Sequence, residues 1–173
     1  MKSKRLKFFL ITIIFCIIIS IVMVEKFKST NEKKLKKYNF KCYFGKRNLD
    51  NLHGFYLIFR SPSCLPTKPE LEKEAQRGAI ITTEIEQLIK MAPCKVIGIT
   101  GSDGKTTTTT LISEILKKAG YNCYVGGNIG TPLFTKLNEI MPDDKVVLEL
   151  SSFQLMGMEV SPNISVITNM YFY

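Results

Sequence analysis

Residues 96–107 read VIGITGSDGKTT, an apolar run that passes through a glycine turn into a lysine and a series of threonines. The apolar residues 95–100 predict a buried strand, and glycine allows the backbone to turn tightly directly after it. Residues 106–119 then predict a helix that ends at Gly120. The N–H groups of such a turn, together with the N-terminus of the following helix, attract an anion.

Residues 101–108, called the phosphate loop below, carry the short pattern G-x-x-G-K-T. The longer Walker pattern G-x-x-x-x-G-K-[ST] is not matched, because its first glycine would fall at Ile99. Lys105 adds a positive charge near terminal phosphates, and the Thr106 hydroxyl suits Mg²⁺. An ordinary surface turn before a helix is the alternative. Five consecutive threonines from Thr106 are costly in a helix, which favours a loop kept for its hydroxyls.

Strands and helices alternate along the rest of the chain. This alternation predicts an α/β fold of three layers, with a mostly parallel sheet and ligands beyond the carboxyl ends of its strands. Downstream of the phosphate loop we expect strands at 122–125, 145–150 and 164–168, a helix at 132–140 and a helical turn at 153–158. Upstream we expect strands at 55–59 and 79–82, and helices opened by the capping boxes Thr67–Glu70 and Thr83–Glu86.

Two polar residues follow predicted strands downstream of the loop. Glu149 ends an apolar strand, where a second Mg²⁺ ligand belongs; an exposed acid is the alternative, which the flanking leucines make less natural. Asn128 lies in the glycine-rich turn 126–130. It is suited to donate to a phosphate or substrate oxygen, although by itself this segment would be a plain turn.

The positive charge of the chain is confined to its N-terminal quarter. The formal net charge is +9, yet residues 1–47 hold 13 lysines and arginines against two acidic residues. Residues 48–173 hold 11 lysines and arginines against 13 acidic residues, and their sequence shows no basic face that would follow a nucleic-acid backbone. We therefore expect no nucleic-acid partner; the basic arm suits an anionic membrane surface better.

An apolar run lies inside the basic arm. Residues 8–24 are 17 positions without a charge, at the lower limit of the about 17–25 residues that span a membrane as a helix. We expect an N-terminal hydrophobic helix there that anchors the chain to a membrane, with the remainder on the cytoplasmic side. A signal peptide is the rival interpretation, although no small-x-small cleavage site follows. A buried soluble helix would need a larger core.

The cysteines and the histidine predict no metal site of their own. Five cysteines occur without a C-x-x-C pair, and His53 is the only histidine. A zinc site of thiolate and imidazole ligands would need a second cluster. We interpret the cysteines as small thiols in a reducing compartment.

Four segments carry a resemblance to a known family. They are residues 99–108 (ITGSDGKTTT), 126–133 (GGNIGTPL), 148–155 (LELSSFQL) and 166–169 (VITN). Together they resemble the Mur ligases of bacterial cell-wall synthesis, and the second and third segments are typical of the members that add D-glutamate. The resemblance runs from about residue 48 to residue 169 and is most specific from residue 95 onward.

This resemblance implies an enzyme that activates a carboxylate with ATP and Mg²⁺. UDP-N-acetylmuramoyl-L-alanine and D-glutamate are the implied substrates; the alanyl carboxylate would become an acyl phosphate that the amine of D-glutamate attacks. Lys105 and Glu149 are the implied catalytic residues, and Thr106 and Glu149 the implied Mg²⁺ ligands. The implied ATP-binding residues are Gly101, Ser102, Asp103, Gly104, Lys105, Thr106, Thr107 and Thr108. The implied substrate-binding residues are Ser61, in a Ser-Pro turn, Asn128, Ser151 and Gln154.

The resemblance also implies a division of the chain. We expect a basic N-terminus with the apolar helix at 1–39, the last part of an N-terminal substrate-binding domain at 40–93, and the central ATP-binding domain at 94–173. Residues 1–44 contain no glycine, whereas the family has a glycine-rich turn after its first strand. After Asn169 the family continues through an acidic-histidine segment, a metal-holding lysine and a C-terminal domain, which these 173 residues do not contain.

Three interpretations of these departures stay open: a gene fragment or frameshifted remnant, an intact short paralogue anchored to a membrane, and one half of a split enzyme. The abrupt C-terminus favours the remnant, and we expect the chain alone to be inactive or nearly so. Two other functions compete with the ligase: a non-catalytic, membrane-tethered ATP-binding module, and a ligase like folylpolyglutamate synthase. The SSFQ segment argues against the last of these.

Overall fold

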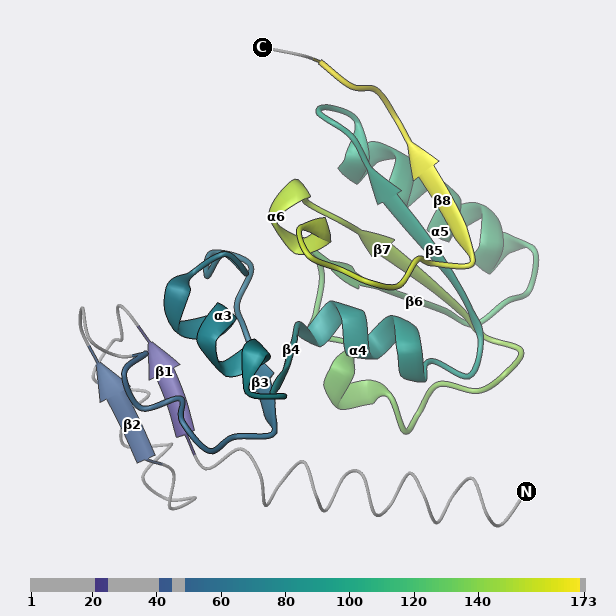
Figure 1. Cartoon of the computed structure of the whole chain (residues 1–173). Helices are drawn as coiled ribbons and strands as arrows, with labels where there is room; N and C mark the ends of the chain where they lie inside the picture. Colours follow the sequence, from purple (N-terminus) through teal and green to yellow (C-terminus); the bar gives the residue numbers. More distant parts are fainter. Residues whose placement is uncertain (1–20, 25–40, 45–48, 172–173) are drawn as a thin grey trace. The chain divides into compact units, whose positions relative to one another are not determined.

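The structure, a computed structural model, describes residues 21–24, 41–44 and 49–171, which fall into two compact units (Figure 1). The first unit holds the described residues up to Leu57 together with Pro69–Ala79. The second unit holds Ile58–Lys68 and the described residues from Ile80 onward. The phosphate loop therefore belongs to the second unit.

A four-stranded parallel sheet forms the centre of the second unit (Figure 1). Its strands are β5 (Lys95–Thr100), β6 (Cys123–Gly127), β7 (Lys145–Glu149) and β8 (Ile164–Ile167). The spatial order is β6-β7-β5-β8, so the last strand lies beside the first. The mostly parallel α/β sheet predicted from the alternation is confirmed here.

Side-chain alternation along β5 assigns its residues to the two faces of the sheet. Ile97 and Ile99 pack on α5 (Lys105–Lys118), against Ile112 and Leu116. Each such buried aliphatic side chain stabilises the fold by roughly 1.5–3 kcal/mol. Gly98 faces the other way, and a Cβ added there would lie 2.6 Å from the ring of Pro162. The sheet is therefore covered on both faces, as the apolar run in β5 predicted.

The helix after the phosphate loop begins one residue earlier than predicted. α5 starts at Lys105, and its N-cap residue, Gly104, has a left-handed backbone with φ 79°. An L side chain rarely adopts this conformation, so glycine is required at the start of α5. At the other end Gly120, with φ 89°, follows the helix as predicted.

The helix predicted at 132–140 is wrong. The structure has only a 3₁₀ turn, η1 (Phe134–Lys136), in a segment of short turns. The helical spacing of Leu133, Leu137 and Ile140 is real, because all three are buried. The N–H groups nevertheless bond three residues back, as from Glu139 to the Lys136 carbonyl (2.8 Å), so the turns stay tight. The turn predicted at 153–158 is the short helix α6 (Ser152–Leu155).

Short elements precede the sheet. β3 (Leu57–Phe59) and β4 (Ile80–Thr82) form a two-stranded sheet, α3 spans Pro69–Gln76, and α4 spans Glu84–Met91. α4 begins where its capping box predicts, and the Thr83 hydroxyl accepts from the Glu86 N–H (3.1 Å). The Glu86 carboxylate does not return the bond to Thr83 but contacts Thr82 and Lys90. Only half of the predicted capping box forms.

A strand occupies the end of the predicted N-terminal helix. β1 (Ile21–Val24) pairs in parallel with β2 (Lys41–Phe44), so the prediction of a helix is wrong for residues 21–24. β-branched residues make up most of β1, and such residues favour a strand over a helix. Residues 8–20 lie outside the described residues. Among the residues that are described, no helix has the length and apolar character that a membrane crossing requires.

Candidate nucleotide-binding site

The phosphate loop connects the carboxyl end of β5 to the first turn of α5. Gly101 has φ 140°, and a Cβ there would lie 2.1 Å from the Thr168 hydroxyl oxygen. Gly104 provides no side chain to cap the helix. The first-turn N–H groups of an α-helix have no carbonyl one turn earlier to bond. The N-terminus of α5 therefore has no side-chain cap, and its N–H groups are of the kind that can bind an anion.

Glu149 reaches the start of α5 because of its place in the strand. Val147 and Glu149 share the face of the sheet that α5 covers, since alternate residues of a strand point the same way. The Thr106 hydroxyl donates to Glu149 Oε2 at 2.7 Å, and Asn128 Nδ2 donates to Oε1 at 3.0 Å. The expected proximity of Thr106 and Glu149 is thus confirmed. Glu149 is only 2% exposed, so these two polar contacts matter for its burial.

The Thr106–Glu149 pair fits a magnesium ion. Octahedral Mg²⁺ with bonds of about 2.0–2.1 Å places neighbouring oxygens about 2.9 Å apart, close to the spacing of this pair. Mg²⁺ commonly takes one or two protein oxygens and completes its shell with waters and phosphates. Throughout the described part of the chain, no group of three or more His, Cys, Asp or Glu side chains could hold a metal alone. Waters or phosphate oxygens would complete the shell of an ion held by this pair.

Lys105 lies folded across its own loop. Its Nζ donates to the carbonyls of Gly101 (2.8 Å) and Ser102 (2.7 Å). The N–H groups of Ser102 and Asp103 donate to Asn169 (3.2 and 2.9 Å). The expectation that successive loop N–H groups point at the anion therefore fails for these two, because the protein already occupies them. The remaining predicted loop residues, Thr107 and Thr108, lie in the first turn of α5.

The predicted substrate residues lie in three different settings. Asn128 joins the phosphate loop through Glu149. Ser151 and Gln154 instead bond to each other: Ser151 Oγ accepts from the Gln154 N–H (3.3 Å), and Gln154 Oε1 accepts from the Ser151 N–H (2.9 Å). They form a capping box at the start of α6. Ser61 is exposed, and its hydroxyl lies 3.0 Å from that of Ser63.

Two residues that contact the phosphate loop, and one buried arginine elsewhere in the second unit, were not among the predicted site residues. Thr168 and Asn169, directly after β8, bond to the phosphate loop because β8 lies beside β5. The signal available in the sequence was that parallel strands end at one edge of a sheet. Arg60 is the third: its guanidinium donates to the carbonyls of Cys64 (3.2 Å) and Met156. Burial lowers the pKa of Arg60 from its ordinary value.

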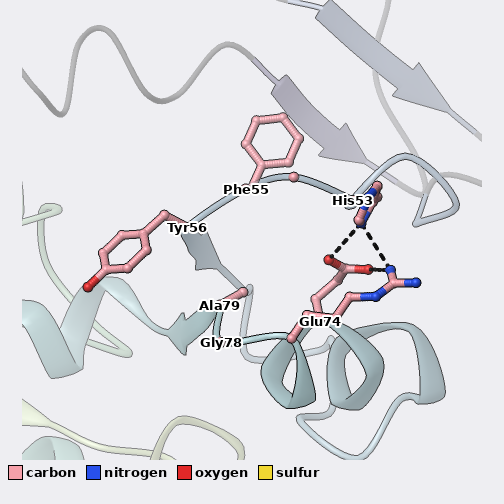
Figure 2. Close-up of a pocket in the computed structure, with 8 residues that line it drawn as sticks. His53, Phe55, Tyr56, Glu74, Gly78 and Ala79 are labelled. Carbon is pink, nitrogen blue, oxygen red and sulfur yellow. Dashed lines mark hydrogen bonds and ion pairs between the residues drawn. The ribbon is translucent and has the colours of Figure 1, made fainter.

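A separate cavity of about 270 Å³ lies in the first unit (Figure 2). Arg77 Nη1 lies 2.5 Å from Glu74 Oε1 and 3.0 Å from His53 Nδ1. The lining residues are His53, Gly54, Phe55, Tyr56, Glu74, Arg77, Gly78 and Ala79. None of the predicted site residues belongs to this cavity.

Comparison with known proteins agrees with the geometry of the loop. A family model described as the Mur ligase middle domain matches residues 99–171. A UDP-N-acetylmuramoylalanine–D-glutamate ligase of Clostridium kluyveri is 53% identical over 137 residues, which are 79% of this chain and 30% of that protein. Two Clostridium botulinum proteins have the same name. One is 56% identical over 137 residues, which are 79% of this chain and 30% of that protein. The other is 51% identical over 154 residues, which are 85% of this chain and 34% of that protein.

The chain spans about a third of the length of these curated relatives. A solved UDP-N-acetylmuramate:L-alanyl-gamma-D-glutamyl-meso-diaminopimelate ligase from Neisseria meningitides matches 88% of this chain and 53% of its own, at 14% identity and a TM-score of 0.49. That likeness is loose, and the assignment stands on the sequence matches. The resemblance inferred from the four segments is confirmed. Residues 99–171 therefore belong to the Mur ligase family, as its middle domain.

Proposed function

We propose that the phosphate loop binds ATP with Mg²⁺ and that the chain serves a D-glutamate ligase acting on UDP-N-acetylmuramoyl-L-alanine. The observation that carries the proposal is the Thr106–Glu149 contact of 2.7 Å at the uncapped start of α5. The names of the relatives supply the reaction class. A phosphate loop alone would be compatible with many reactions.

We assign a part to several residues in and near the loop. The Lys105 ammonium and the N-terminus of α5 neutralise the phosphates, which is most of what phosphoryl transfer asks of a protein. Thr106 and Glu149 hold Mg²⁺, which offsets repulsion between a carboxylate and a polyphosphate. Asn128 orients the Glu149 carboxylate through their 3.0 Å contact. Ser61, Asn128, Ser151 and Gln154 are proposed to lie toward the muramoyl substrate.

The division of the chain follows the same proposal. Residues 40–93 would correspond to the end of the substrate-binding domain and residues 94–173 to the central ATP-binding domain, as layers of helix around the parallel sheet. We place their action in the cytoplasm. Membrane anchoring through residues 8–24 stays a prediction. Recovery of the whole chain in the membrane fraction of lysed cells would test it.

Equilibrium binding tests the nucleotide site. Calorimetric titration of the whole chain with ATP and Mg²⁺ should show binding that Thr106→Val weakens, with Thr110→Val as a matched control. The Thr110 hydroxyl donates to the Thr106 carbonyl at 2.9 Å, within the same helix. A folded chain that binds no ATP would contradict the proposal.

Turnover separates the ligase from a non-catalytic ATP-binding module. The measurement is phosphate release that requires both UDP-N-acetylmuramoyl-L-alanine and D-glutamate. Such release from the chain would favour the ligase and contradict the expectation that the chain alone is inactive. ATP binding without release would fit either function, so both measurements are needed together.

A further inference from the structure

The segment after β8 lies against one side of the phosphate loop. The N–H of Ser102 donates to the Asn169 carbonyl (3.2 Å), and the N–H of Asp103 donates to Asn169 Oδ1 (2.9 Å). Asn169 Nδ2 donates back to the Asp103 carbonyl (3.2 Å), which also accepts from the Thr168 hydroxyl (2.5 Å). Asn169 thus holds the N–H ends of two successive peptide groups of the loop and the carbonyl end of the third.

Lys105 contacts the same two peptide groups from the opposite side, through the carbonyls of Gly101 and Ser102. In a trans peptide the C=O and the following N–H point in opposite directions. In each of these two peptide groups, the carbonyl therefore accepts from the Lys105 ammonium and the N–H donates to Asn169. Holding the N–H ends fixes the direction of the carbonyls, and the carbonyls fix the position of the ammonium.

The next peptide group of the loop is reversed. Its carbonyl, on Asp103, faces Thr168 and Asn169, so the N–H of Gly104 points to the side of the Lys105 ammonium. The left-handed backbone of Gly104 allows this reversal. The ammonium, the Gly104 N–H and the first turn of α5 then face one side together, where phosphate oxygens can meet all three.

We propose that Asn169 is a positioning residue of the phosphate loop, which sets the Lys105 ammonium and the Gly104 N–H toward the polyphosphate of a nucleotide. The inference rests on the proposed function, since it requires ATP to bind at the loop. Hydrogen bonds in a chain that ends on a charged group polarise one another and are stronger than isolated ones. The contact joins residues 66 positions apart, so the packing of β8 beside β5 creates it.

Nucleotide affinity of the whole chain tests the proposal. Asn169→Ala removes both side-chain bonds to Asp103, and the expected loss of ATP affinity in the presence of Mg²⁺ is about tenfold. Asn169→Leu removes the same bonds at similar volume and serves if the alanine variant folds poorly. The matched control is Asn163→Ala: Asn163 Oδ1 accepts from the Val96 N–H (2.8 Å) in β5, away from the loop. Its ATP affinity should stay within about twofold of wild type.

A second comparison separates positioning from general loss of stability. If Asn169 acts through Lys105, the same substitution made in a Lys105→Ala chain should cost about threefold or less, because coupled residues are not additive. Without nucleotide, hydrogen exchange at the Asp103 N–H should accelerate in Asn169→Ala, while exchange at Val96 stays unchanged.

The outcomes distinguish this proposal from the function on which it rests. Wild-type affinity in both Asn169 variants, or equal losses with and without Lys105, overturns the role of Asn169 and leaves the ATP site standing. A folded wild-type chain that binds no ATP overturns both. Loss in the Asn169 variants, retention in Asn163→Ala and a smaller loss without Lys105 support the proposal.

Discussion

Two helices of the second unit begin directly after neighbouring parallel strands, yet their N-termini are completed in different ways. α6 follows β7 and is closed by the reciprocal Ser151–Gln154 capping box. α5 follows β5 and begins at a left-handed glycine that offers no cap. The chain caps the first N–H groups of α6 itself and provides no side-chain cap at α5, where we propose that a ligand binds. Where no side chain caps the helix that follows a strand, its first N–H groups remain available to an anion.

The neighbouring polar contacts sharpen this difference. At α5, the Thr106 hydroxyl contacts the Glu149 carboxylate across 43 residues of sequence, and Asn128, directly after β6, adds a second contact to that carboxylate. At α6, the partners are three residues apart. A local contact stabilises the element in which it lies, whereas contacts assembled from three elements can place charge where a ligand needs it.

Gly101→Ala should have the largest effect, because it forces a Cβ into the Thr168 hydroxyl at a glycine-only backbone conformation. We expect ATP affinity to fall at least about a hundredfold and the free energy of unfolding by about 2–3 kcal/mol. Calorimetry and urea denaturation measure the two effects. Gly120→Ala is the control: its φ is also positive, but the space around it is open. Equal ATP affinity in Gly101→Ala would remove the loop from the site.

Glu149→Gln should come next. It keeps the shape of the side chain and removes the negative charge that Mg²⁺ requires, so affinity for ATP with Mg²⁺ should fall about tenfold to a hundredfold. Titration of Mg²⁺ at fixed ATP measures the effect, and the exposed Asp143→Asn is a charge-matched control. An unchanged Mg²⁺ dependence would show that Glu149 serves only to hold Thr106 and Asn128.

Ser151→Ala should lower stability without changing ATP affinity. Loss of the cap lowers the free energy of unfolding by about 1 kcal/mol and leaves ATP affinity unchanged, since α6 satisfies its own N-terminus. Urea denaturation measures the first and calorimetry the second. Thr83→Ala, at the start of α4, removes a similar cap and provides the reference value. A loss of nucleotide affinity in Ser151→Ala alone would mean that the two helix starts are not independent.

Glu86→Gln should give the smallest effect, a change in how the stability of the protein depends on pH. Burial raises the pKa of Glu86, but bonds to Lys90 and Thr82 outweigh burial, so the pKa is lowered from its ordinary value of 4.5. A carboxyl whose pKa is lowered on folding adds stability above its unfolded pKa, and this is lost as the pH falls through the folded pKa. Stability should therefore drop below about pH 4.5 less steeply in Glu86→Gln than in wild type. Urea denaturation between pH 3 and pH 7 measures this, and parallel curves would contradict it.

Much of the second unit could be predicted from local signals. The apolar run and glycine turn predicted β5 at its observed bounds and α5 within one residue. The rule that ligands bind at the carboxyl ends of parallel strands predicted Glu149 near the phosphate loop. The helix predicted at 132–140 failed because its apolar spacing is shared by a series of buried tight turns. The predicted N-terminal helix is wrong at residues 21–24, because apolar content by itself does not separate helix from strand.

Local patterning along the chain was sufficient for the approximate positions of the four strands of the parallel sheet and for the glycines of the loop. Tertiary structure decided which residues support the loop: Asn169 reaches Asp103, and Ser151 turns to Gln154 instead of outward. The reason is the distance along the sequence over which each kind of interaction acts. Propensity, periodicity and caps act over a few residues, whereas the order β6-β7-β5-β8 depends on how the strands pack, and that order brings the end of β8 to the loop.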